Sequence, residues 1–280
     1  MQIINGKNLR DEILVDIKKQ VLDLHFIPVF CDVLVGSDPS SVQYVNLKKK
    51  NALSLGIKFH DAIYDQSITT EELLKEIQKL NLLDNMCGII IQLPLPAHID
   101  TRQVLDAIDP VLDVDALGGK VSENFYTGNE ELVPPTALSV MALVDSLKIN
   151  LSDRNIVVLG EGKLVGKPVA QLFKNRNLKF TVLNSASINK EEIIKNADII
   201  VSGIGKGKYL TGDMVKDGVI IVDAGTSEEE GSIVGDVDFE SVSGKASHIT
   251  PVPGGVGPVT VAMLFMNVLK VAKKLQNESR

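Results

Sequence analysis

Tyr44 and Lys48 stand four residues apart in SSVQYVNLKKKNALSLGI, residues 40–57. On a helix these two side chains share one face, about one turn apart, whereas Lys49 and Lys50 point elsewhere. A lysine amine that is kept out of water can act as a general base toward a bound substrate. Three consecutive lysines more commonly form a solvated surface. We predict that Lys48 is a catalytic residue and that Lys49 and Lys50 remain at the surface.

A polar side chain ends the apolar run in GIIIQLPLP, residues 88–96. We predict a fully buried strand that closes at Gln92, with Pro94 and Pro96 stopping the sheet. In open parallel sheets, ligands bind beyond the carboxyl ends of the strands. Gln92 is therefore a candidate site residue, and the alternative is an ordinary polar residue at a strand end.

Two further stretches have residue types that suit ligand binding. Asp113 and Asp115 lie in the turn-rich stretch DPVLDVDALGG, where carboxylates can ligate a metal, cap a loop or recognise an amino-substituted heterocycle. No histidine lies in this stretch, so a metal is not expected. The stretch TPVPGGVGPVT, residues 250–260, precedes a predicted long helix. Its glycines and prolines indicate a fixed backbone that a ligand approaches closely, a rigid interdomain hinge, or both.

A glycine-rich turn, GEGKLVG, follows a predicted strand and precedes a predicted helix. Gly160, Gly162 and Gly166 give the spacing G-x-G-x-x-x-G, one residue longer than the common dinucleotide fingerprint. Such glycines allow a tight turn and let a pyrophosphate approach the helix N-terminus. An ordinary strand–helix turn is the alternative, but the βαβ context favours dinucleotide binding.

The residues near this turn give two opposing signals about the nicotinamide cofactor. NAD-binding domains often carry an acid about 20 residues further on, at the end of the second strand, where this chain has Asn184 and Ser185. Ser185 can donate a hydrogen bond to a 2′-phosphate, which favours NADP. Glu161, in contrast, would repel a 2′-phosphate and accept a hydrogen bond from a 2′-hydroxyl, unless it is a solvated loop carboxylate or Lys163 or Lys167 offsets it.

These residues must be positioned by alternating strands and helices. Strands are predicted over residues 28–35, 57–62, 87–92, 155–160, 179–183, 198–202 and 218–223. A repeat of apolar residues every four positions predicts a helix around residues 9–21, Thr69 and Glu72 form a capping box before another, and a last helix is predicted over 258–275. This alternation indicates parallel sheets covered by helices.

The pattern occurs twice, on either side of ELVPPTALSVMALV, where a connecting helix is predicted to start near Thr136. We predict an α/β protein with two α/β domains joined by long helices. Residues 1–137 with 257–280 form a three-layer catalytic domain, and residues 138–256 form a Rossmann-like dinucleotide-binding domain. The apolar stripe of the last helix is expected to pack against the first domain.

The composition narrows the class of protein. The chain has 280 residues and a net charge of −7, which argues against a general nucleic-acid binder. Cys31 and Cys87 lie in apolar runs and are predicted to be buried, reduced thiols. No pair of histidines has metal-ligand spacing, and no signal peptide or membrane-length apolar run is apparent. We expect a cytoplasmic protein without metal, nucleic-acid or membrane partners.

Together these segments resemble the methylenetetrahydrofolate dehydrogenase/cyclohydrolase family. The resemblance runs nearly end to end and is most specific in ITPVPGGVGPVT, with further matches in GIIIQLPLP, DVDALGG, VVLGEGKLVGKPVAQLF, GVIIVDAG and VGDVDFE. It implies oxidation of 5,10-methylene-tetrahydrofolate with NADP+ to the methenyl cation, followed by hydrolysis to 10-formyl-tetrahydrofolate. It also implies a homodimer that binds tetrahydrofolate derivatives.

The resemblance assigns roles to matching positions. Tyr44 would flank the folate ring, Lys48 would be the catalytic lysine, Gln92 would hold it, and Asp115 would bind the amino edge of the pterin. Substrate contacts would come from Tyr44, Asp115, Pro253, Gly254 and Gly255. Cofactor contacts would come from Gly160, Glu161, Gly162, Val165, Gly166, Ser185 and Gly225. Because the product is a cation, Lys48 is expected to work as a dry, neutral amine that accepts a proton from the attacking water.

The chain departs from the family pattern at several positions. Glu161-Gly162 stands where the family commonly has Arg-Ser, and Asn184 and Ala186 replace residues that help to hold a 2′-phosphate, so NAD use is expected to be possible. Ala116 replaces a glycine, so the turn after Asp115 must tolerate a Cβ. The remaining alternatives are another two-domain NAD(P)-dependent dehydrogenase of small amino or hydroxy acids, and a non-catalytic folate-binding relative.

Overall fold

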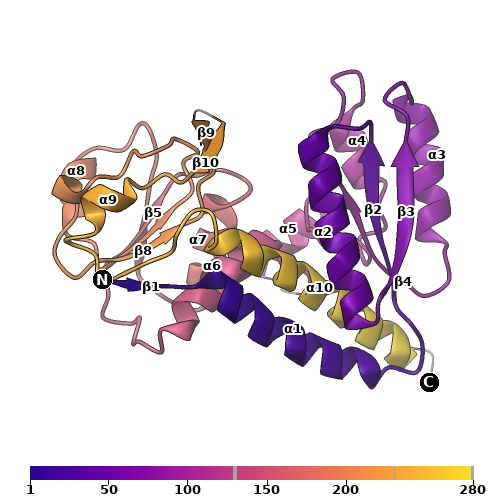
Figure 1. Ribbon diagram of the computed structural model, residues 1–280, viewed down its shortest axis with the longest axis horizontal. Helices are drawn as coiled ribbons and strands as arrows, with labels where there is room; N and C mark the ends of the chain where they lie inside the picture. The colour runs from indigo at the N-terminus through magenta and orange to yellow at the C-terminus, as the bar shows by residue number, and fades with distance from the viewer. Residues whose placement is uncertain (129–130, 230, 279–280) are drawn as a thin grey trace. The chain divides into compact units, whose positions relative to one another are not determined.

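Apolar, β-branched runs of this chain form parallel strands, and helices cover them (Figure 1). The computed structural model describes residues 1–128, 131–229 and 231–278. The chain divides into two units. Unit 1 comprises Met1–Asp11 and Thr136–Met263, and unit 2 comprises Glu12–Pro135 and Leu264–Arg280.

Unit 2 contains a parallel three-stranded sheet in the order β3-β2-β4. Its elements are β2 (Val29–Val35), α2 (Pro39–Leu55), β3 (Lys58–Tyr64), α3 (Thr70–Asn81), β4 (Met86–Ile91), α4 (Thr101–Asp106) and α5 (Gly119–Tyr126). The chain passes from central β2 to β3 on one side and then to β4 on the other. The carboxyl ends of β2 and β4 therefore border a topological switch point, where open α/β sheets bind ligands.

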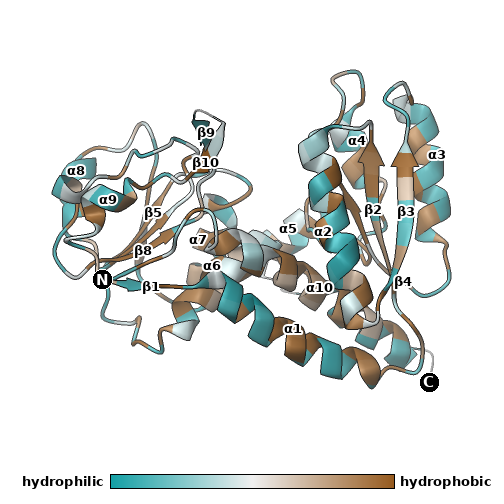
Figure 2. Ribbon diagram, viewed as in Figure 1, coloured by the Kyte–Doolittle hydropathy of each residue, from teal (hydrophilic) through white to brown (hydrophobic). Residues whose placement is uncertain are grey.

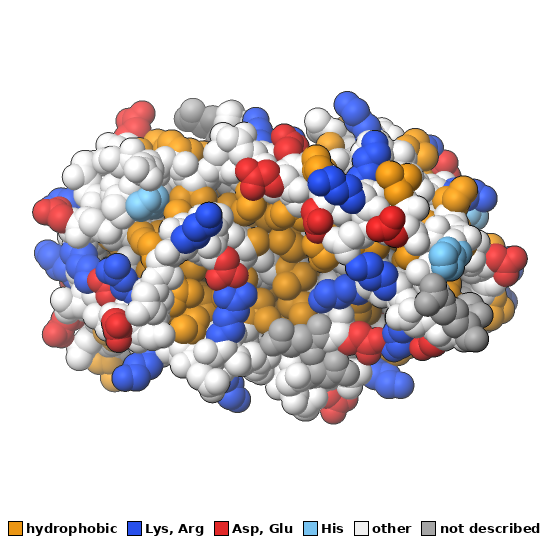
Figure 3. Space-filling view, turned by 90° about the horizontal axis from the view of Figure 1, so that it is seen from below, with side chains coloured by type: hydrophobic (Ala, Val, Ile, Leu, Met, Phe, Trp, Pro, Cys, Tyr) orange, Lys and Arg blue, Asp and Glu red, His pale blue; other side chains and the backbone are white. Residues whose placement is uncertain are grey.

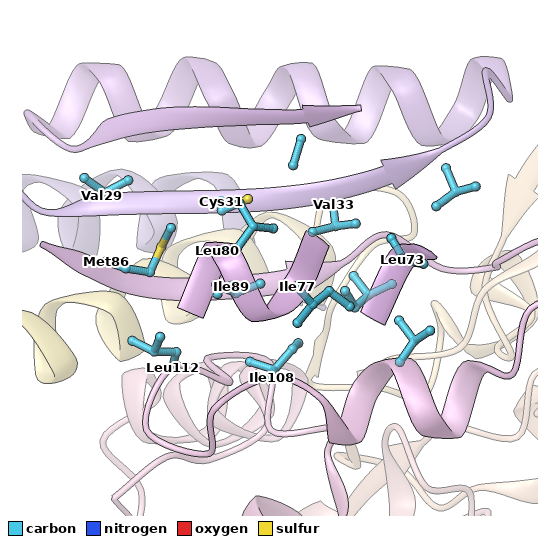
Figure 4. Close-up of a cluster of buried hydrophobic side chains, with 14 of the residues drawn as sticks. Val29, Cys31, Val33, Leu73, Ile77, Leu80, Met86, Ile89, Ile108 and Leu112 are labelled. Carbon is cyan, nitrogen blue, oxygen red and sulfur yellow. The ribbon is translucent and has the colours of Figure 1, made fainter. Parts of the chain in front are cut away.

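Successive side chains of β2 point to opposite faces of the sheet. One face forms an apolar core with α3 and the segment after α4 (Figure 4), including Val29, Cys31, Val33, Leu73, Ile77, Leu80, Met86, Ile89, Ile108 and Leu112. On the other face, the ring of Phe30 lies 5.3 Å from that of Phe265, in α10 (Val256–Glu278). Asp32 shares this second face and is fully buried.

Local signals fix the register of α2 and α3. The side chain of Asp38 accepts a hydrogen bond of 2.9 Å from the Ser41 amide at the start of α2, and Gly56 ends the helix at φ +83°. The predicted capping box of Thr69 and Glu72 is present at the start of α3. The register of α2 decides which of its lysines faces the sheet.

Unit 1 contains a six-stranded parallel sheet in the order β1-β11-β8-β7-β5-β6. Its strands are β1 (Gln2–Ile3), β5 (Ile156–Leu159), β6 (Phe180–Leu183), β7 (Ile199–Ser202), β8 (Ile220–Asp223) and β11 (His248–Ile249), with a hairpin of β9 (Ser227–Glu229) and β10 (Ser232–Val234). Its helices are α6 (Pro135–Ser146), α7 (Gly166–Asn175), α8 (Lys190–Lys195), η1 (Gly212–Met214) and α9 (Phe239–Val242). The switch point of this sheet lies between β5 and β7.

The predicted fold class and all seven predicted strands are confirmed, with small shifts at their ends. The connecting helix starts at Pro135, next to the predicted Thr136. Helices α1 (Gly6–Leu22) and α10 have residues in both units. The division places Met1–Asp11, residues 136–137 and residues 257–263 in unit 1, whereas the predicted boundaries assign them to the catalytic domain. Met1–Asp11 belongs to unit 1 because β1 pairs with β11. Short β1, β9, β10 and β11 were not predicted.

Hydropathy follows the strand positions (Figure 2). Central β2 is apolar along most of its length and buried at every position, whereas edge strand β3 alternates between buried and exposed residues. Cys31 and Cys87 are buried free thiols, as predicted, and burial raises the pKa of Cys87 to about 12. On the face shown in Figure 3, lysines and arginines are interspersed with aspartates and glutamates.

The expectation that no apolar segment has the length of a membrane span is wrong for α10. This helix is long and apolar enough to cross a membrane by length and composition, and it is the one such helix among the described residues. Within its most apolar window, 61% is buried inside the protein, as in a core helix of a soluble protein. The side chain of Asn267 in α10 donates hydrogen bonds of 2.8 Å to the carbonyls of Val114 and Val133 of unit 2. The predicted packing of this helix against the catalytic unit is thus present.

Candidate active site

Lys48 points from α2 toward the carboxyl edge of the unit 2 sheet. It belongs to the buried stripe of the helix and is 9% exposed. Its Nζ donates a hydrogen bond of 2.8 Å to Oε1 of Gln92, the residue that follows β4. The Gln92 Nε2 donates to the Leu93 carbonyl at 3.0 Å, which turns the amide oxygen toward the lysine. The structure therefore brings together Lys48 and Gln92, which the sequence indicated separately.

Asp32 is a third member of this cluster that sequence reasoning missed. Its Oδ2 lies 2.7 Å from the Lys48 Nζ, and its side chain is fully buried. Its Oδ1 has no hydrogen-bond partner among the described residues. Burial raises the pKa of Asp32, and the nearby Lys48 ammonium opposes this rise. The signal was present in VFCDVLV, because a charged residue in the middle of a buried apolar strand requires a partner.

Asp32 changes the expected electrostatics of the site. The expectation of a dry amine agrees with the burial of Lys48, but this amine does not stand alone. The proton can reside on the lysine, giving an ion pair, or on the aspartate, giving two neutral groups. In both states the pair has no net charge, so the site does not depend on desolvation alone to avoid a positive charge.

The other residues of the lysine segment separate as their spacing predicts. Tyr44 lies one turn before Lys48 and is 52% exposed, so its ring is free to contact a ligand. Lys49 forms an ion pair of 2.7 Å with Asp61 and lies over the ring of Phe59. Lys50 is exposed. Of the three lysines, Lys48 is the one that faces the site.

The two aspartates after β4 have different environments. Asp113 is buried, and its Oδ2 accepts a hydrogen bond of 2.7 Å from the Gly118 amide, so it holds the loop together. Asp115 is partly buried, with no hydrogen-bond partner for its side chain among the described residues. Burial, reinforced by Asp113, raises the pKa of Asp115 to about 6, and Lys48 opposes the rise. Ala116 adopts φ +55°, the left-handed conformation that favours the glycine it replaces.

The glycine-rich turn of unit 1 lies at the switch point between β5 and β7. Gly160 has φ +98°, and a Cβ there would meet the Gly203 carbonyl oxygen at 2.6 Å. Gly166 begins α7, where a Cβ would lie 2.0 Å from the Gly160 oxygen. Val165 packs against Gly203, and the space beside Gly162 is open. The glycines thus permit a tight loop at the N-terminus of α7.

Glu161 lies between the ends of β5 and β6. Its Oε2 accepts a hydrogen bond of 3.0 Å from Nδ2 of Asn184, which follows β6. The carboxylate is therefore held at the end of the second strand, where NAD-binding domains commonly carry their ribose-binding acid. Ser185 is exposed, and its carbonyl accepts a hydrogen bond of 2.9 Å from Lys190. Glu161 is an exposed residue of the loop edge whose carboxylate is hydrogen-bonded to Asn184.

Gly225 has a packing role that sequence reasoning did not anticipate. A Cβ at this buried residue would lie 2.1 Å from the Asp236 carboxylate. Asp236 accepts hydrogen bonds from the Ser202 hydroxyl at 2.8 Å and the Ile204 amide at 2.7 Å, so it holds the loop after β7. Buried Asp223 accepts a hydrogen bond of 2.9 Å from the Gly225 amide, and burial raises its pKa to about 6. The two aspartates were missed, although carboxyl groups at the ends of buried runs were a visible signal.

The PGG loop, Pro253, Gly254 and Gly255, belongs to unit 1, whereas Lys48 and Gln92 belong to unit 2. Gly254 has φ +114°, and its carbonyl accepts a hydrogen bond of 3.1 Å from the Gly6 amide. A Cβ on Gly255 would lie 2.6 Å from Cβ of Thr250. The loop backbone is therefore tightly constrained within unit 1.

The switch point of unit 1 suits a dinucleotide. No side chain caps the N-terminus of α7. The Lys167 amide donates a hydrogen bond of 3.0 Å to the Gly162 carbonyl, and Pro168 has no N–H to donate. The approach of a pyrophosphate therefore rests on the dipole of α7 and on the absence of side chains at the glycines. Gly160, Gly162 and Gly166 would hold the pyrophosphate, and Glu161 would face the adenosine ribose. Among residues 1–128, 131–229 and 231–278, no cluster of three or more histidine, cysteine or acidic side chains is arranged to hold a metal.

Comparison with known proteins identifies both halves of the chain. Residues 4–115 match the catalytic domain of tetrahydrofolate dehydrogenase/cyclohydrolase, and residues 134–276 match its NAD(P)-binding domain. The chain is 42% identical over 278 residues to the bifunctional protein FolD of Clostridium acetobutylicum, covering 97% of this chain and 99% of the relative.

Solved structures give the same result. The crystal structure of the bifunctional enzyme FolD from Campylobacter jejuni is 38% identical, has a TM-score of 0.93, and covers 98% of this chain and 99% of that one. The Trypanosoma brucei enzyme, in complex with NADP cofactor and inhibitor, is 33% identical with a TM-score of 0.90, covering 98% and 97%. Nothing in these matches supports a dehydrogenase of small amino or hydroxy acids. The chain belongs to the tetrahydrofolate dehydrogenase/cyclohydrolase family.

Proposed function

We propose that this protein oxidises 5,10-methylene-tetrahydrofolate with NAD(P)+ and hydrolyses the resulting 5,10-methenyl-tetrahydrofolate to 10-formyl-tetrahydrofolate. Unit 2 binds the folate and carries the catalytic residues, and unit 1 binds the dinucleotide. The observation that carries this proposal is the buried amine of Lys48, which Gln92 and Asp32 hold at the switch point of unit 2. Family membership of both halves supports the same assignment.

The oxidation step requires a site that tolerates a cation. NAD(P)+, when bound, supplies the hydride acceptor. Loss of hydride from the methylene carbon leaves a positive charge on the substrate, which a lone ammonium would destabilise. The Lys48–Asp32 pair adds no net charge beside this centre. Gln92 keeps the amine in place, so that it stays near the reacting carbon throughout.

The hydrolysis step requires a base. Water attacks the methenyl carbon, the new C–O bond forms, and the water must lose a proton as the ring opens. The Lys48 amine accepts this proton as general base, a contribution typically worth about 10²–10⁴-fold. The amide oxygen of Gln92 accepts a hydrogen bond from the Lys48 amine. This bond orients the amine so that its lone pair can face the substrate.

Substrate contacts are proposed for residues around this centre. The half-exposed ring of Tyr44 would stack on the folate ring system. Asp115, whose carboxylate is free of protein partners among the described residues, would accept hydrogen bonds from the amino edge of the pterin. Pro253, Gly254 and Gly255 would contact the substrate through their constrained backbone.

The choice of nicotinamide is proposed to lean toward NAD+. Glu161 is held by Asn184 at the end of β6, and its negative charge would repel a 2′-phosphate. Ser185 and the nearby lysines keep NADP+ binding possible. A steady-state comparison of kcat/KM for NAD+ and NADP+ tests this, and a strong preference for NADP+ would contradict the role of Glu161.

The central experiment follows the absorbance of methenyl-tetrahydrofolate with each nicotinamide. Its formation from the methylene form reports the dehydrogenase, and its decay without cofactor reports the cyclohydrolase. Lys48→Met should reduce cyclohydrolase activity by at least about 100-fold, while substrate binding is largely retained. Hydrolysis by Lys48→Met at the native rate would refute the role of Lys48, and absence of both activities in the native protein would refute the proposed function.

We also propose a cytoplasmic homodimer. The family resemblance supports this state, and the measurement is the molar mass in solution by light scattering. A monomer of 30.3 kDa at micromolar concentration would contradict it.

A further inference from the structure

Asp32 is built into the site more rigidly than any other charged group near Lys48. It lies in the middle of central strand β2, hydrogen-bonded on both sides to β3 and β4. Its backbone therefore cannot shift without disturbing the sheet. One carboxylate oxygen lies 2.7 Å from the lysine Nζ, and the other has no hydrogen-bond partner among the described residues. A buried carboxylate with a single partner is costly for the fold, which points to a role in the reaction.

Among the described residues, no other ionisable group forms an ion pair with Lys48 or Asp32. Asp61 is the register partner of Asp32 on β3, but it is paired with Lys49 at 2.7 Å. Cys31 precedes Asp32 and points into the core on the opposite face of the sheet, where burial raises its pKa. Asp115 approaches from the loop after β4 and interacts electrostatically with both members of the pair.

We infer that Asp32 is a positioning residue that acts through Lys48, holding the amine in place and taking up or returning the single proton that the two groups share. The inference rests on the proposed cyclohydrolase function. The 2.7 Å contact and the burial of both side chains carry it.

The proton balance explains what the carboxylate adds. When the shared proton moves from Nζ to Asp32, the amine gains a free lone pair while the net charge of the site stays at zero. The amine then accepts the proton from the attacking water, and the pair carries one positive charge. That excess proton leaves to solvent after the C–O bond has formed, which restores the starting state. Without Asp32, the lysine would have to release its own proton to water before each turnover.

The test is the pH dependence of kcat for cyclohydrolase, measured without any nicotinamide and corrected for spontaneous hydrolysis. In Asp32→Asn the shared-proton state is lost, so Lys48 must give up its own proton to solvent before it can act as a base. We expect the acid limb of kcat to move to higher pH by at least about one unit, and kcat at pH 7 to fall at least about 10-fold. KM should change less than about threefold, because Asp32 is buried behind Lys48. Asp32→Glu, which retains a carboxylate, should keep the position of the acid limb.

The matched control is Asp61→Asn, which removes the carboxylate of the neighbouring lysine pair on the same sheet and should leave the profile unchanged. If Asp32→Asn is folded and its kcat profile matches the native one, desolvation alone prepares Lys48 and the inference is overturned. If Asp32→Asn does not fold, Asp32→Val, which suits a buried strand, is measured in its place with the same criteria. Failure of Lys48→Met to impair hydrolysis would instead overturn the proposed function itself, so the two failures are distinguishable.

Discussion

Replacing Lys48 with methionine should destabilise the fold as well as remove the catalyst. Methionine has similar length but no charge, so Asp32 is left buried without a counter-charge. Removing one partner of a buried ion pair typically costs about 3–5 kcal/mol. Asp32 cannot shift to reach water, because its strand is paired with β3 on one side and with β4 on the other.

The loss of stability in Lys48→Met has an upper bound, because Asp32 can take up a proton instead of remaining charged. In the unfolded chain an aspartate titrates near pH 4, and each pH unit above this value costs about 1.4 kcal/mol for a carboxyl that stays protonated in the folded state. The penalty in Lys48→Met is therefore at most about 4 kcal/mol at pH 7 and falls below about 2 kcal/mol at pH 5. The sign follows from the direction of the shift. Burial raises the pKa of Asp32, and loss of the opposing lysine raises it further, so stability is retained at low pH and lost as pH rises above about 4.

Urea unfolding of the native protein and Lys48→Met at pH 5 and pH 7 measures this slope. The chain has no tryptophan and four tyrosines, of which Tyr44, Tyr64 and Tyr126 lie in unit 2, so tyrosine fluorescence reports mainly on this unit. The double variant Lys48→Met/Asp32→Val should recover the lost stability, since apolar replacements of buried ion pairs are often neutral or stabilising.

Lys49→Met serves as the control, because its partner Asp61 is half exposed and the pair should be worth about 1 kcal/mol or less. If Lys48→Met is as stable as the native protein at pH 7, Asp32 is not left with an unpaired charge and the reasoning fails. The reasoning also fails if Lys48→Met is less stable than the double variant by the same amount at pH 5 and at pH 7.

Three further outcomes are expected. Glu161→Ser should raise the ratio of kcat/KM for NADP+ to that for NAD+ by roughly 30-fold, since one charge about 4 Å from a doubly charged phosphate in water contributes about 2 kcal/mol. Asp153→Ser, which makes the same charge change before β5 at the opposite edge of the sheet, should leave this ratio unaltered. Because burial raises the pKa of Asp115 to about 6 and its proposed role requires the carboxylate, kcat/KM for the folate should fall as pH drops below 6. In Asp115→Asn, kcat/KM should be low at every pH and should not show this fall. Gly225→Ala should lower the free energy of unfolding by about 1–3 kcal/mol, as overpacking does, because its Cβ would meet the Asp236 carboxylate at 2.1 Å. A calorimetric scan with an unchanged unfolding midpoint would contradict this packing role.

The sequence predicts those parts of the site that depend on one element. The four-residue spacing of Tyr44 and Lys48, and the polar end of the third strand at Gln92, each follow from a single helix or strand. The 2.8 Å contact between Lys48 and Gln92 does not, because it requires the packing of α2 on the sheet. Resemblance to a family supplied the pairing that spacing could not.

Other features depend on distant segments and are harder to predict. Strand β1 is two residues long and pairs with β11, at residues 248–249, so no local sequence pattern predicts it. Asp113 and Asp115 look alike in a turn, and only the Gly118 amide decides that Asp113 turns inward. Asp32 differs, because a carboxylate between Cys31 and Val33 in a buried strand should have prompted a search for a cationic partner.

Both units contain a topological switch point, but different residue types stand at it. In each unit, the chain forms one strand, then a neighbouring strand on one side of it and the next strand on the other side. Ligands bind at the carboxyl edge of a sheet at such a point. Unit 1 ends its strand with Gly160, which in the proposed function lets a pyrophosphate come against bare backbone. Unit 2 ends its strand with Gln92, which in the proposed function holds the lysine amine at a fixed distance from the reacting carbon. Gln92 can orient that amine but cannot hold its proton, whereas the carboxylate of Asp32 can do both from the central strand. Chemistry in unit 2 should therefore be more sensitive to loss of charge at Asp32, as in Asp32→Asn, than to lengthening of the side chain, as in Asp32→Glu.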